Sequence, residues 1–174
     1  MKKGLIFAFL LAICSSCSPS FDYFGDPSPV EYIGPNGEHF DAIIENNNWW
    51  ASYPVWTGPS LQLYAHLDGT FTLYVIKFSY PDSRLTVVSN FTGLGTYSLG
   101  DSSTGSYAWF VRQASDSSFH HFYTDHLHHG TLEITAIDTT LRLISGTISF
   151  TAIEKDSVIT LHNGTFKAQY PGKL

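Results

Sequence analysis

The sequence predicts an all-β protein: an antiparallel β-sandwich or barrel of about ten strands, preceded by a signal peptide and a Pro-rich tether. Beyond Gly37, short runs of alternating apolar and polar residues follow one another, separated by Gly and Ser clusters. No segment of this part keeps the 3.6-residue apolar period of a helix. Hydrophobic residues make up 43% of the 174 residues, enough for the core of a single domain, which we place at residues 37–174.

Residues 1–16 carry the features of an export signal. Lys2 and Lys3 form a positively charged start, and the apolar run that follows is too short to span a bilayer as a permanent helix. Small residues then lead to Cys17. This pattern resembles bacterial lipoprotein signal peptides, in which the cleavage site ends at a Cys that receives the lipid. A plain cleaved signal or a short membrane anchor is the alternative.

Cys17 is the predicted lipidation site. Cys14 follows Ile13, where such signals carry a small residue, whereas Cys17 follows Ser16. Two or three acyl chains on one Cys anchor a protein stably, since each buried methylene contributes about 0.8 kcal/mol. We therefore expect an exported protein whose lipid anchor holds it in the membrane of the bacterial cell envelope. The expected membrane is the outer one, with the periplasmic and surface faces both left open.

Residues 17–36 form the predicted tether. Four of the eight Pro of the chain lie here, and a Pro-rich segment is stiff and extended. Phe21, Tyr23 and Phe24 are unusual in a free linker. They either dock onto the domain or lie at the membrane interface.

A hairpin is predicted over residues 61–78. Asp68-Gly69 suits the type I′ turn of a two-residue hairpin loop. Pairing across that turn defines the predicted core face, which carries Leu61, Leu63, Ala65, Leu67, Tyr74, Ile76 and Phe78. The opposite face, with Leu73 and Val75, is mixed, and we expect it to be partly covered or to line a cavity.

A second hairpin is predicted over residues 131–153, around Asp138-Thr139-Thr140. Its apolar residues alternate with Ser, Thr and Glu, as in a sheet with one wet face: Leu132, Ile134, Ala136, Ile144, Ile148, Phe150 and Ala152. The strand over residues 157–170 changes parity at Asn163-Gly164. A bulge or a tight hairpin would explain the change, and we favour the bulge because this strand is one residue longer than its partner. Further strands are predicted near residues 38–45, 49–56, 84–91, 95–99, 105–113 and 119–124.

Several motifs occur together over residues 38–170. The segments GTLEITAIDTTLRLISGTISFTA and VITLHNGTFKAQY contain a Gly-Thr strand, an Asp-Thr-Thr turn, a Ser-Gly-Thr-x-Ser-Phe strand and a closing Asn-Gly-x-Phe strand. GTYSLG (Gly95–Gly100) and FDAIIENNNWWAS (Phe40–Ser52) lie upstream. In these motifs the chain resembles a family of uncharacterised bacterial lipoproteins. The resemblance implies a secreted, lipid-anchored, β-rich domain of unknown function, and it brings no catalytic or binding residues.

The densest group of chemically active side chains is a His-rich segment. The candidate metal ligands are His120, His121, Asp125, His126, His128 and His129. Neutral imidazole binds Zn²⁺ and other divalent transition metals, and on a strand His126 and His128 would project to one face. The alternatives are an exposed polar segment without a ligand and a pH-responsive loop.

A second candidate site is aromatic. Trp49, Trp50, Tyr53 and Trp56 lie within eight residues. Exposed aromatic rings stack on sugars or form the centre of a protein interface. Because Trp49 and Trp50 are adjacent, a regular strand places them on opposite faces, and at most one of them belongs to a single core.

Composition and motifs exclude several functions. The net charge of −6 argues against a nucleic-acid partner. The sequence has no G-x-S-x-G, S-x-x-K or H-E-x-x-H motif, so we do not expect an enzyme. We predict a non-catalytic binding or structural lipoprotein with no cofactor, and a glycan or an envelope protein as its partner. The alternatives are binding of a glycan or small apolar ligand through Trp49–Trp56, and a metal-binding protein or metal-dependent enzyme that uses His120–His129.

Overall fold

The computed structural model describes residues 36–51, 61–65, 69–77 and 82–170, with residues 50, 51, 61–65 and 71 described by their backbone alone. The predicted signal peptide, Cys17 and nearly all of the tether lie outside the described residues. The described part is built from strands and one short 3-10 helix, Ser102–Thr104, which confirms the all-β prediction. Within it, no helix is long and apolar enough to cross a membrane.

Eleven strands are described. In chain order they are β1 His39–Ile44, β2 Asn47–Ala51, β3 Leu61–Ala65, β4 Thr70–Lys77, β5 Ser83–Asn90, β6 Gly95–Leu99, β7 Tyr107–Gln113, β8 Phe119–Tyr123, β9 Gly130–Asp138, β10 Leu143–Glu154 and β11 Ser157–Gln169. All of their pairings are antiparallel.

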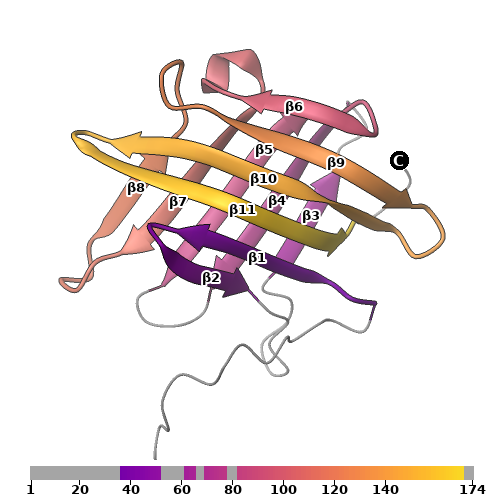
Figure 1. Cartoon of the computed structure of the whole chain (residues 1–174), viewed down its shortest axis with the longest axis horizontal. Helices are drawn as coiled ribbons and strands as arrows, with labels where there is room; N and C mark the ends of the chain where they lie inside the picture. Colours follow the sequence, from indigo (N-terminus) through magenta and orange to yellow (C-terminus); the bar gives the residue numbers. More distant parts are fainter. Residues whose placement is uncertain (1–35, 52–60, 66–68, 78–81, 171–174) are drawn as a thin grey trace, which may run out of the picture. The chain divides into compact units, whose positions relative to one another are not determined.

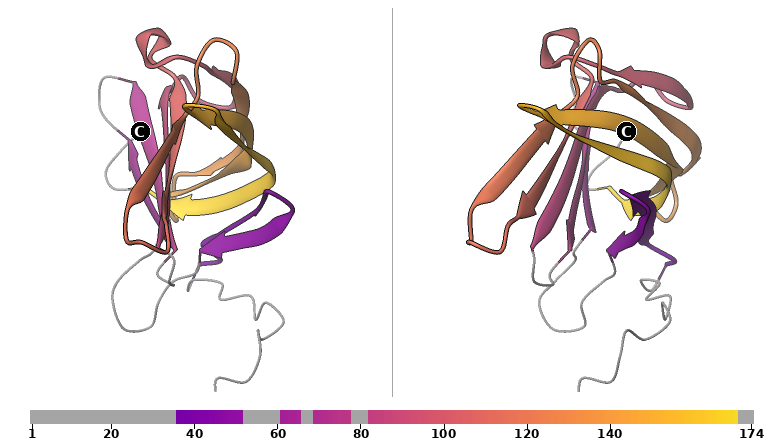
Figure 2. Two further views of the ribbon diagram at one scale, coloured as in Figure 1. Left: turned by 90° about the vertical axis from the view of Figure 1, so that its left-hand side faces the viewer. Right: turned by 60° about the vertical axis from the view of Figure 1, so that its left-hand side comes forward.

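These strands form one sheet that curls into a half-barrel with two facing layers (Figure 1). Its main path runs β2-β1-β11-β10-β8-β7-β5-β4-β3, while β9 pairs with β10 and β6 pairs with β9. We call β2-β1-β11-β10-β9-β6 the six-stranded layer and β8-β7-β5-β4-β3 the five-stranded layer. The layers join where Ile153, near the end of β10, pairs with Tyr123 of β8. Figure 2 shows the two layers facing each other.

The core lies between the two layers. Alternate strand positions fill it, among them Phe40, Leu132, Leu161 and Phe166 from the six-stranded layer and Leu85, Val87 and Phe110 from the five-stranded layer. Removing such side chains from water stabilises the fold by about 25 cal/mol for each Å² of apolar surface. Because successive side chains of a strand point to opposite faces, the remaining positions form the outer face of each layer.

The hairpin predicted over residues 61–78 is present as β3 and β4, but its predicted register is wrong. Ala65 pairs with Phe71, so residues 66–70 connect the paired strands. The prediction placed a two-residue turn at Asp68-Gly69 instead. The observed register differs from the predicted one by a single residue, and such a shift turns every side chain of a strand to the other face.

The shift decides which side of β4 enters the core. Leu73 and Val75 are fully buried, whereas Tyr74 and Ile76 are only half-buried. The prediction that Tyr74 and Ile76 face the core is therefore wrong. Both lie on the outer face of the five-stranded layer.

The predicted bulge in β11 is confirmed. Ile148 of β10 pairs with Gly164 and Phe150 pairs with Leu161, so β11 carries one extra residue between these pairs. Asn163 adopts the left-handed conformation there, with a φ of 53°. Gly164 is required for a different reason, because a Cβ at this position would lie 2.5 Å from Cγ2 of Ile148. The buried positions of β11 change parity across the bulge, as predicted.

A second bulge lies in β9, where the sequence pattern predicts none. Ser145 pairs with Ala136 and Gly146 pairs with Ile134, which leaves Thr135 as the extra residue. Ala136 is exposed as a result, and the prediction that it faces the core is wrong. Ile134, before the bulge, is buried as predicted.

The first hairpin is tighter than predicted. Ile44 pairs with Asn47, so Glu45 and Asn46 alone form the turn. Both have positive φ, 49° and 65°, as a type I′ turn requires. The second strand thus begins two residues before its predicted start at residue 49.

Candidate functional site

The His-rich segment divides between a strand and a turn. β8 carries His120 and His121, which are exposed, while residues 124–129 connect β8 to β9. The premise that His126 and His128 lie on a strand is wrong, because β8 ends before them. The part of the chain that the structure describes contains no group of three or more His, Cys, Asp or Glu side chains that could hold a metal ion.

Asp125 organises the turn after β8. Its Oδ1 accepts the backbone N–H groups of Leu127, at 2.8 Å, and of His128, at 2.6 Å, and Nδ1 of His128 lies 3.0 Å away. The bond from the backbone of His128 is the largest effect, and together these bonds hold the pKa of Asp125 below its ordinary value. Nδ1 of His129 lies 3.3 Å from the carbonyl oxygen of Leu127. These side chains therefore stabilise the turn itself, while His126 is exposed.

Two side-chain contacts connect the layers near β8. Nδ1 of His120 lies 2.7 Å from Oε2 of Glu154 on β10, and Nη1 of Arg112 on β7 lies 2.6 Å from Oε2 of Glu45 in the first turn. Burial raises the pKa of Glu154, but hydrogen bonds from the backbone of His121 and from the His120 imidazole outweigh it, so this pKa lies below its ordinary value. These groups have structural partners within the fold.

Trp49 belongs to the core. It is 6% exposed and packs edge-on against Phe40 and Phe110, with ring centroids 5.3 Å and 5.8 Å away. Its Nε1 donates a hydrogen bond of 2.8 Å to Oγ of Ser83. The ring is therefore enclosed between the two layers and does not present a stacking surface to a ligand.

The other predicted aromatic ligand-binding residues are not seen as side chains. Trp50 is described by its backbone alone, and Tyr53 and Trp56 lie outside the described residues. A different set of aromatic rings lies on the outer face of the five-stranded layer.

This set crosses four neighbouring strands in register. Tyr74 on β4 pairs with Thr86 on β5, Thr86 pairs with Trp109 on β7, and Trp109 pairs with Tyr123 on β8. We call Tyr74, Thr86, Trp109 and Tyr123 the aromatic row. All four face outward, because the residues before and after each of them are buried.

Two further rings extend the aromatic row along the strands. Tyr107 stacks on Trp109, with ring centroids 5.5 Å apart and an interplanar angle of 17°. His121 stacks on Tyr123, at 6.4 Å and 12°. Tyr123 is 49% exposed, and the rings of Tyr107 and Trp109 are half-buried. Two near-parallel ring pairs thus lie on adjacent strands, an arrangement that can stack against the apolar face of a ligand.

Thr86 lies in the middle of the aromatic row, between Tyr74 and Trp109. Although it faces outward, it is only 3% exposed, and its Oγ1 makes no hydrogen bond to any described residue. A buried hydroxyl without a partner costs about 1–3 kcal/mol. The aromatic row therefore contains an unsatisfied hydrogen-bonding group at its centre.

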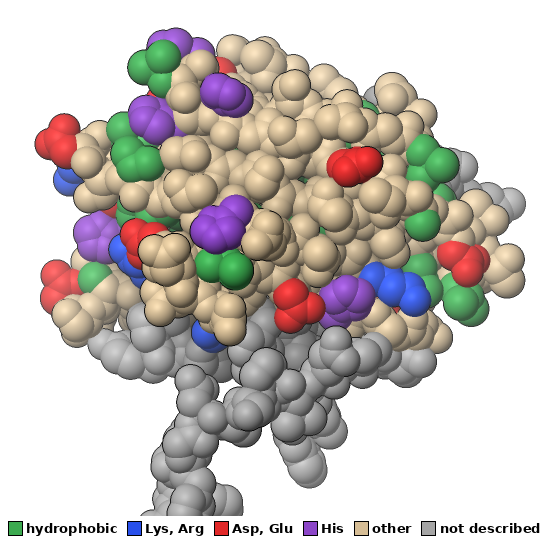
Figure 3. Space-filling model, in the orientation of Figure 1, with side chains coloured by type: hydrophobic (Ala, Val, Ile, Leu, Met, Phe, Trp, Pro, Cys, Tyr) green, Lys and Arg blue, Asp and Glu red, His purple; other side chains and the backbone are tan. Residues whose placement is uncertain are grey.

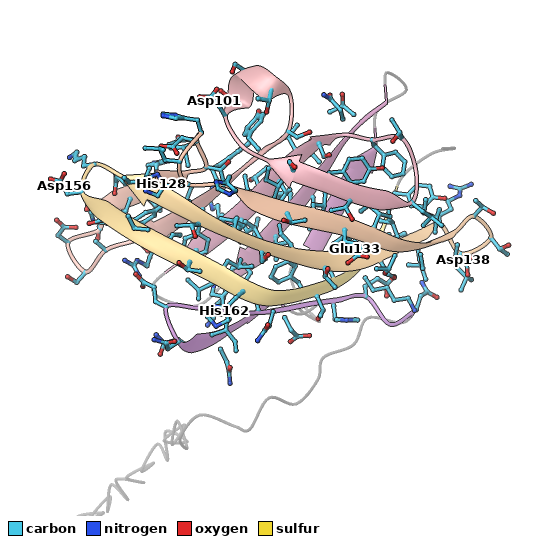
Figure 4. The ribbon with its side chains drawn as sticks, turned by 45° about the horizontal axis from the view of Figure 1, so that its top comes forward. Asp101, His128, Glu133, Asp138, Asp156 and His162 are labelled. Carbon is cyan, nitrogen blue, oxygen red and sulfur yellow. The ribbon has the colours of Figure 1, made fainter. Side chains whose placement is uncertain are left out.

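The outer face of the six-stranded layer is different. Its outward positions on β9, β10 and β11 are mainly Thr and Ser: Thr131, Glu133, Thr147, Ser149, Thr151, Thr160, His162 and Thr165. Figure 3 views this side, where hydrophobic side chains are sparse at the centre. Figure 4 labels Glu133 and His162 on it. This is the wet face that the alternation in β10 predicts.

The sequence does not predict the aromatic row, because apolar and polar residues do not alternate in β7. Residues 107–111 are all apolar or aromatic, so both faces of β7 look like core faces. The register error in β4 also assigned Tyr74 to the wrong face. The feature of the sequence that could have indicated the aromatic row is that β7 is apolar on both sides, which is typical of a strand covered on both faces.

Three comparisons relate the chain to known proteins. No curated protein and no solved structure matches it. A family model matches residues 40–168, a range that includes β7, β8 and the whole aromatic row. This match confirms the expectation of an uncharacterised domain family. The chain therefore belongs to the family described as a domain of unknown function, DUF6252.

Proposed function

We propose that this protein is a lipid-anchored binding module of the bacterial cell envelope that holds carbohydrate on the aromatic row and catalyses no reaction. The observation that carries the proposal is the aromatic row itself: three rings, and one hydroxyl without a partner among the described residues, in register on an outer face. Cys17 would carry the acyl chains, and the Pro-rich tether would hold the domain away from the membrane.

Carbohydrate suits both kinds of group in the aromatic row. A sugar ring has an apolar face of C–H groups, which packs on an aromatic ring, and hydroxyls at its edge. The hydroxyls would pair with Oγ1 of Thr86, which has no hydrogen-bond partner among the described residues, after a side-chain movement that uncovers this buried atom. A purely apolar ligand would leave that hydroxyl unsatisfied.

The aromatic row runs across the strands, and its length favours an oligosaccharide over a single sugar as the ligand. Neighbouring strands lie about 4.8 Å apart, so the distance from β4 to β8 is about 14 Å. A ligand that contacts Tyr74, Trp109 and Tyr123 together must have that length and must cross the strands. An oligosaccharide of several units meets both requirements.

The test measures binding of soluble oligosaccharides to the full-length chain in detergent by calorimetry. Tyr123→Ala should weaken binding roughly fivefold to tenfold, because one stacked ring contributes about 1 kcal/mol. Val158→Ala is the matched control, since Val158 is 47% exposed and lies on β11, off the aromatic row. Equal affinity of the wild type and the Tyr123→Ala variant, or no binding to any member of a broad panel, would refute the proposal.

A further inference from the structure

The two layers differ in charge as well as in their outer faces. No Asp or Glu lies within the strand bounds of β3, β4, β5, β7 and β8, although the chain has 15 acidic residues against nine basic ones. The same five strands carry Lys77, Arg84 and Arg112. The strands of the six-stranded layer carry four acidic residues and one Lys: Asp41, Glu133, Asp138, Glu154 and Lys167.

Most acidic side chains of the described part lie elsewhere on the molecule, although Asp82 directly precedes β5, two residues from Arg84. Those labelled in Figure 4 are Asp101, Glu133, Asp138 and Asp156, which lie on the six-stranded layer or in turns. An anionic ligand on the aromatic row therefore meets no carboxylate on the described strands beneath it. Because like charges repel, the same ligand would be disfavoured on most other surfaces of this acidic protein.

Arg84 is the basic residue that the described strands place on this outer face. It lies two residues from Thr86 along β5, about 7 Å away, and it is exposed. Its neighbours on the same face are apolar, since it pairs with Ile76 of β4 and Val111 of β7. Arg112, in contrast, is paired with Glu45, whereas Arg84 makes no ion pair with a described residue. With no such partner in the described part of the chain, its exposed guanidinium can pair with a ligand.

We infer that the carbohydrate bound by the aromatic row is acidic, with carboxylates that pair with Arg84. The inference rests on the proposed function, since it names the chemistry of the ligand at the same site. A planar guanidinium binds a carboxylate through two parallel hydrogen bonds, which adds direction to the attraction. The rings would hold the sugar faces, and Arg84 would select those that carry charge.

The experiment compares two oligosaccharides of equal length and linkage, a β-1,4-linked oligoglucuronate and the neutral β-1,4-linked oligoglucoside. Calorimetry with the full-length chain in detergent should show tighter binding of the oligoglucuronate, by about fivefold. Added salt should reduce this difference, because the charges lie near the surface. Arg84→Gln should abolish the preference and leave affinity for the neutral oligosaccharide unchanged. Lys167→Gln, a charge change on the six-stranded layer, is the matched control.

Each outcome has one meaning. Equal affinity for both oligosaccharides, with no effect of Arg84→Gln, would overturn the acidic-ligand inference and leave carbohydrate binding intact. No binding of either oligosaccharide, or of any other glycan, would overturn the proposed function itself. Binding of a Cys17→Ala variant, which has no acyl chains, to vesicles that contain an anionic lipid, without binding to either oligosaccharide, would overturn both and assign the aromatic face to the membrane.

Discussion

The six-stranded and five-stranded layers share one core but present opposite outer faces. The first has Ser and Thr at most outward positions and four acidic residues in its strands. The second has aromatic rings at its centre, Arg84 beside them and no acidic residue in its strands. Core packing places the same demand on both inner faces, so it does not account for the difference outside. A ligand on one face only would account for it.

The two described Trp side chains show the same contrast within one residue type. Trp49 lies between the layers, with two aromatic neighbours and a hydrogen bond to Ser83. Trp109 lies outside, stacked on Tyr107 and paired across the strands with Tyr123. The fold buries the first ring and supplies its hydrogen-bond partner, whereas part of the surface of the second ring stays exposed. Residue type alone therefore does not identify a binding ring.

The largest expected effect comes from replacing each of these two Trp residues with Ala in separate variants. Trp49→Ala should destabilise the fold by about 3–5 kcal/mol, because it empties a core site. Trp109→Ala should lower stability by roughly 1–2 kcal/mol and weaken carbohydrate binding at least as much as Tyr123→Ala. Urea unfolding and calorimetry measure the two effects.

A milder variant keeps this comparison falsifiable if Trp49→Ala fails to fold. Trp49→Phe retains most of the packing and removes only the bond to Ser83, at a cost of about 1–3 kcal/mol, with binding unchanged. A larger stability loss for Trp109→Ala than for Trp49→Ala would contradict the distinction between the core ring and the binding ring.

A smaller change in stability, in the opposite direction, is expected for a substitution at Thr86. Thr86→Val keeps the shape of the side chain and removes a buried hydroxyl without a partner, so stability should stay equal or rise by up to about 1 kcal/mol. Carbohydrate binding should weaken at the same time. The matched control is Thr147→Val on the six-stranded layer, where the hydroxyl is exposed and donates to Glu133 at 3.4 Å. A loss of stability in Thr86→Val with unchanged binding would show that the hydroxyl has a structural partner.

The smallest effect concerns the turn at Asp125 and appears only in acid. The pKa of Asp125 in the folded protein is lowered, so its contribution to stability is present above the unfolded pKa, near 3.9, and is lost as pH falls through the folded value. Asp125→Asn should lower the urea midpoint at pH 7 and match the wild type in strong acid. Asp156→Asn is the control, since Asp156 is exposed and its carboxylate accepts no hydrogen bond from a described residue. A difference between wild type and Asp125→Asn that grows towards low pH would contradict this account.

Much of the fold follows from local patterns. The hairpin of β9 and β10 was predictable because apolar and polar residues alternate cleanly there, and the bulge in β11 because the alternation changes parity at Asn163. The register of β3 and β4 was not predictable from the sequence, since both faces of these strands carry apolar residues and either face could enter a core. The bulge at Thr135 was missed because no Gly or Asn lies beside Thr135 within β9.

The sequence by itself determined the all-β class, most strand positions, the family resemblance and a predicted lipid anchor at Cys17, because each depends on residues close together along the chain. Only the tertiary structure decided that Trp49 lies in the core, that the His-rich segment ends in a turn, and that Tyr74, Thr86, Trp109 and Tyr123 lie in one row. These facts depend on register across strands far apart in sequence. A shift of one residue in any pairing would have dispersed the aromatic row over two faces.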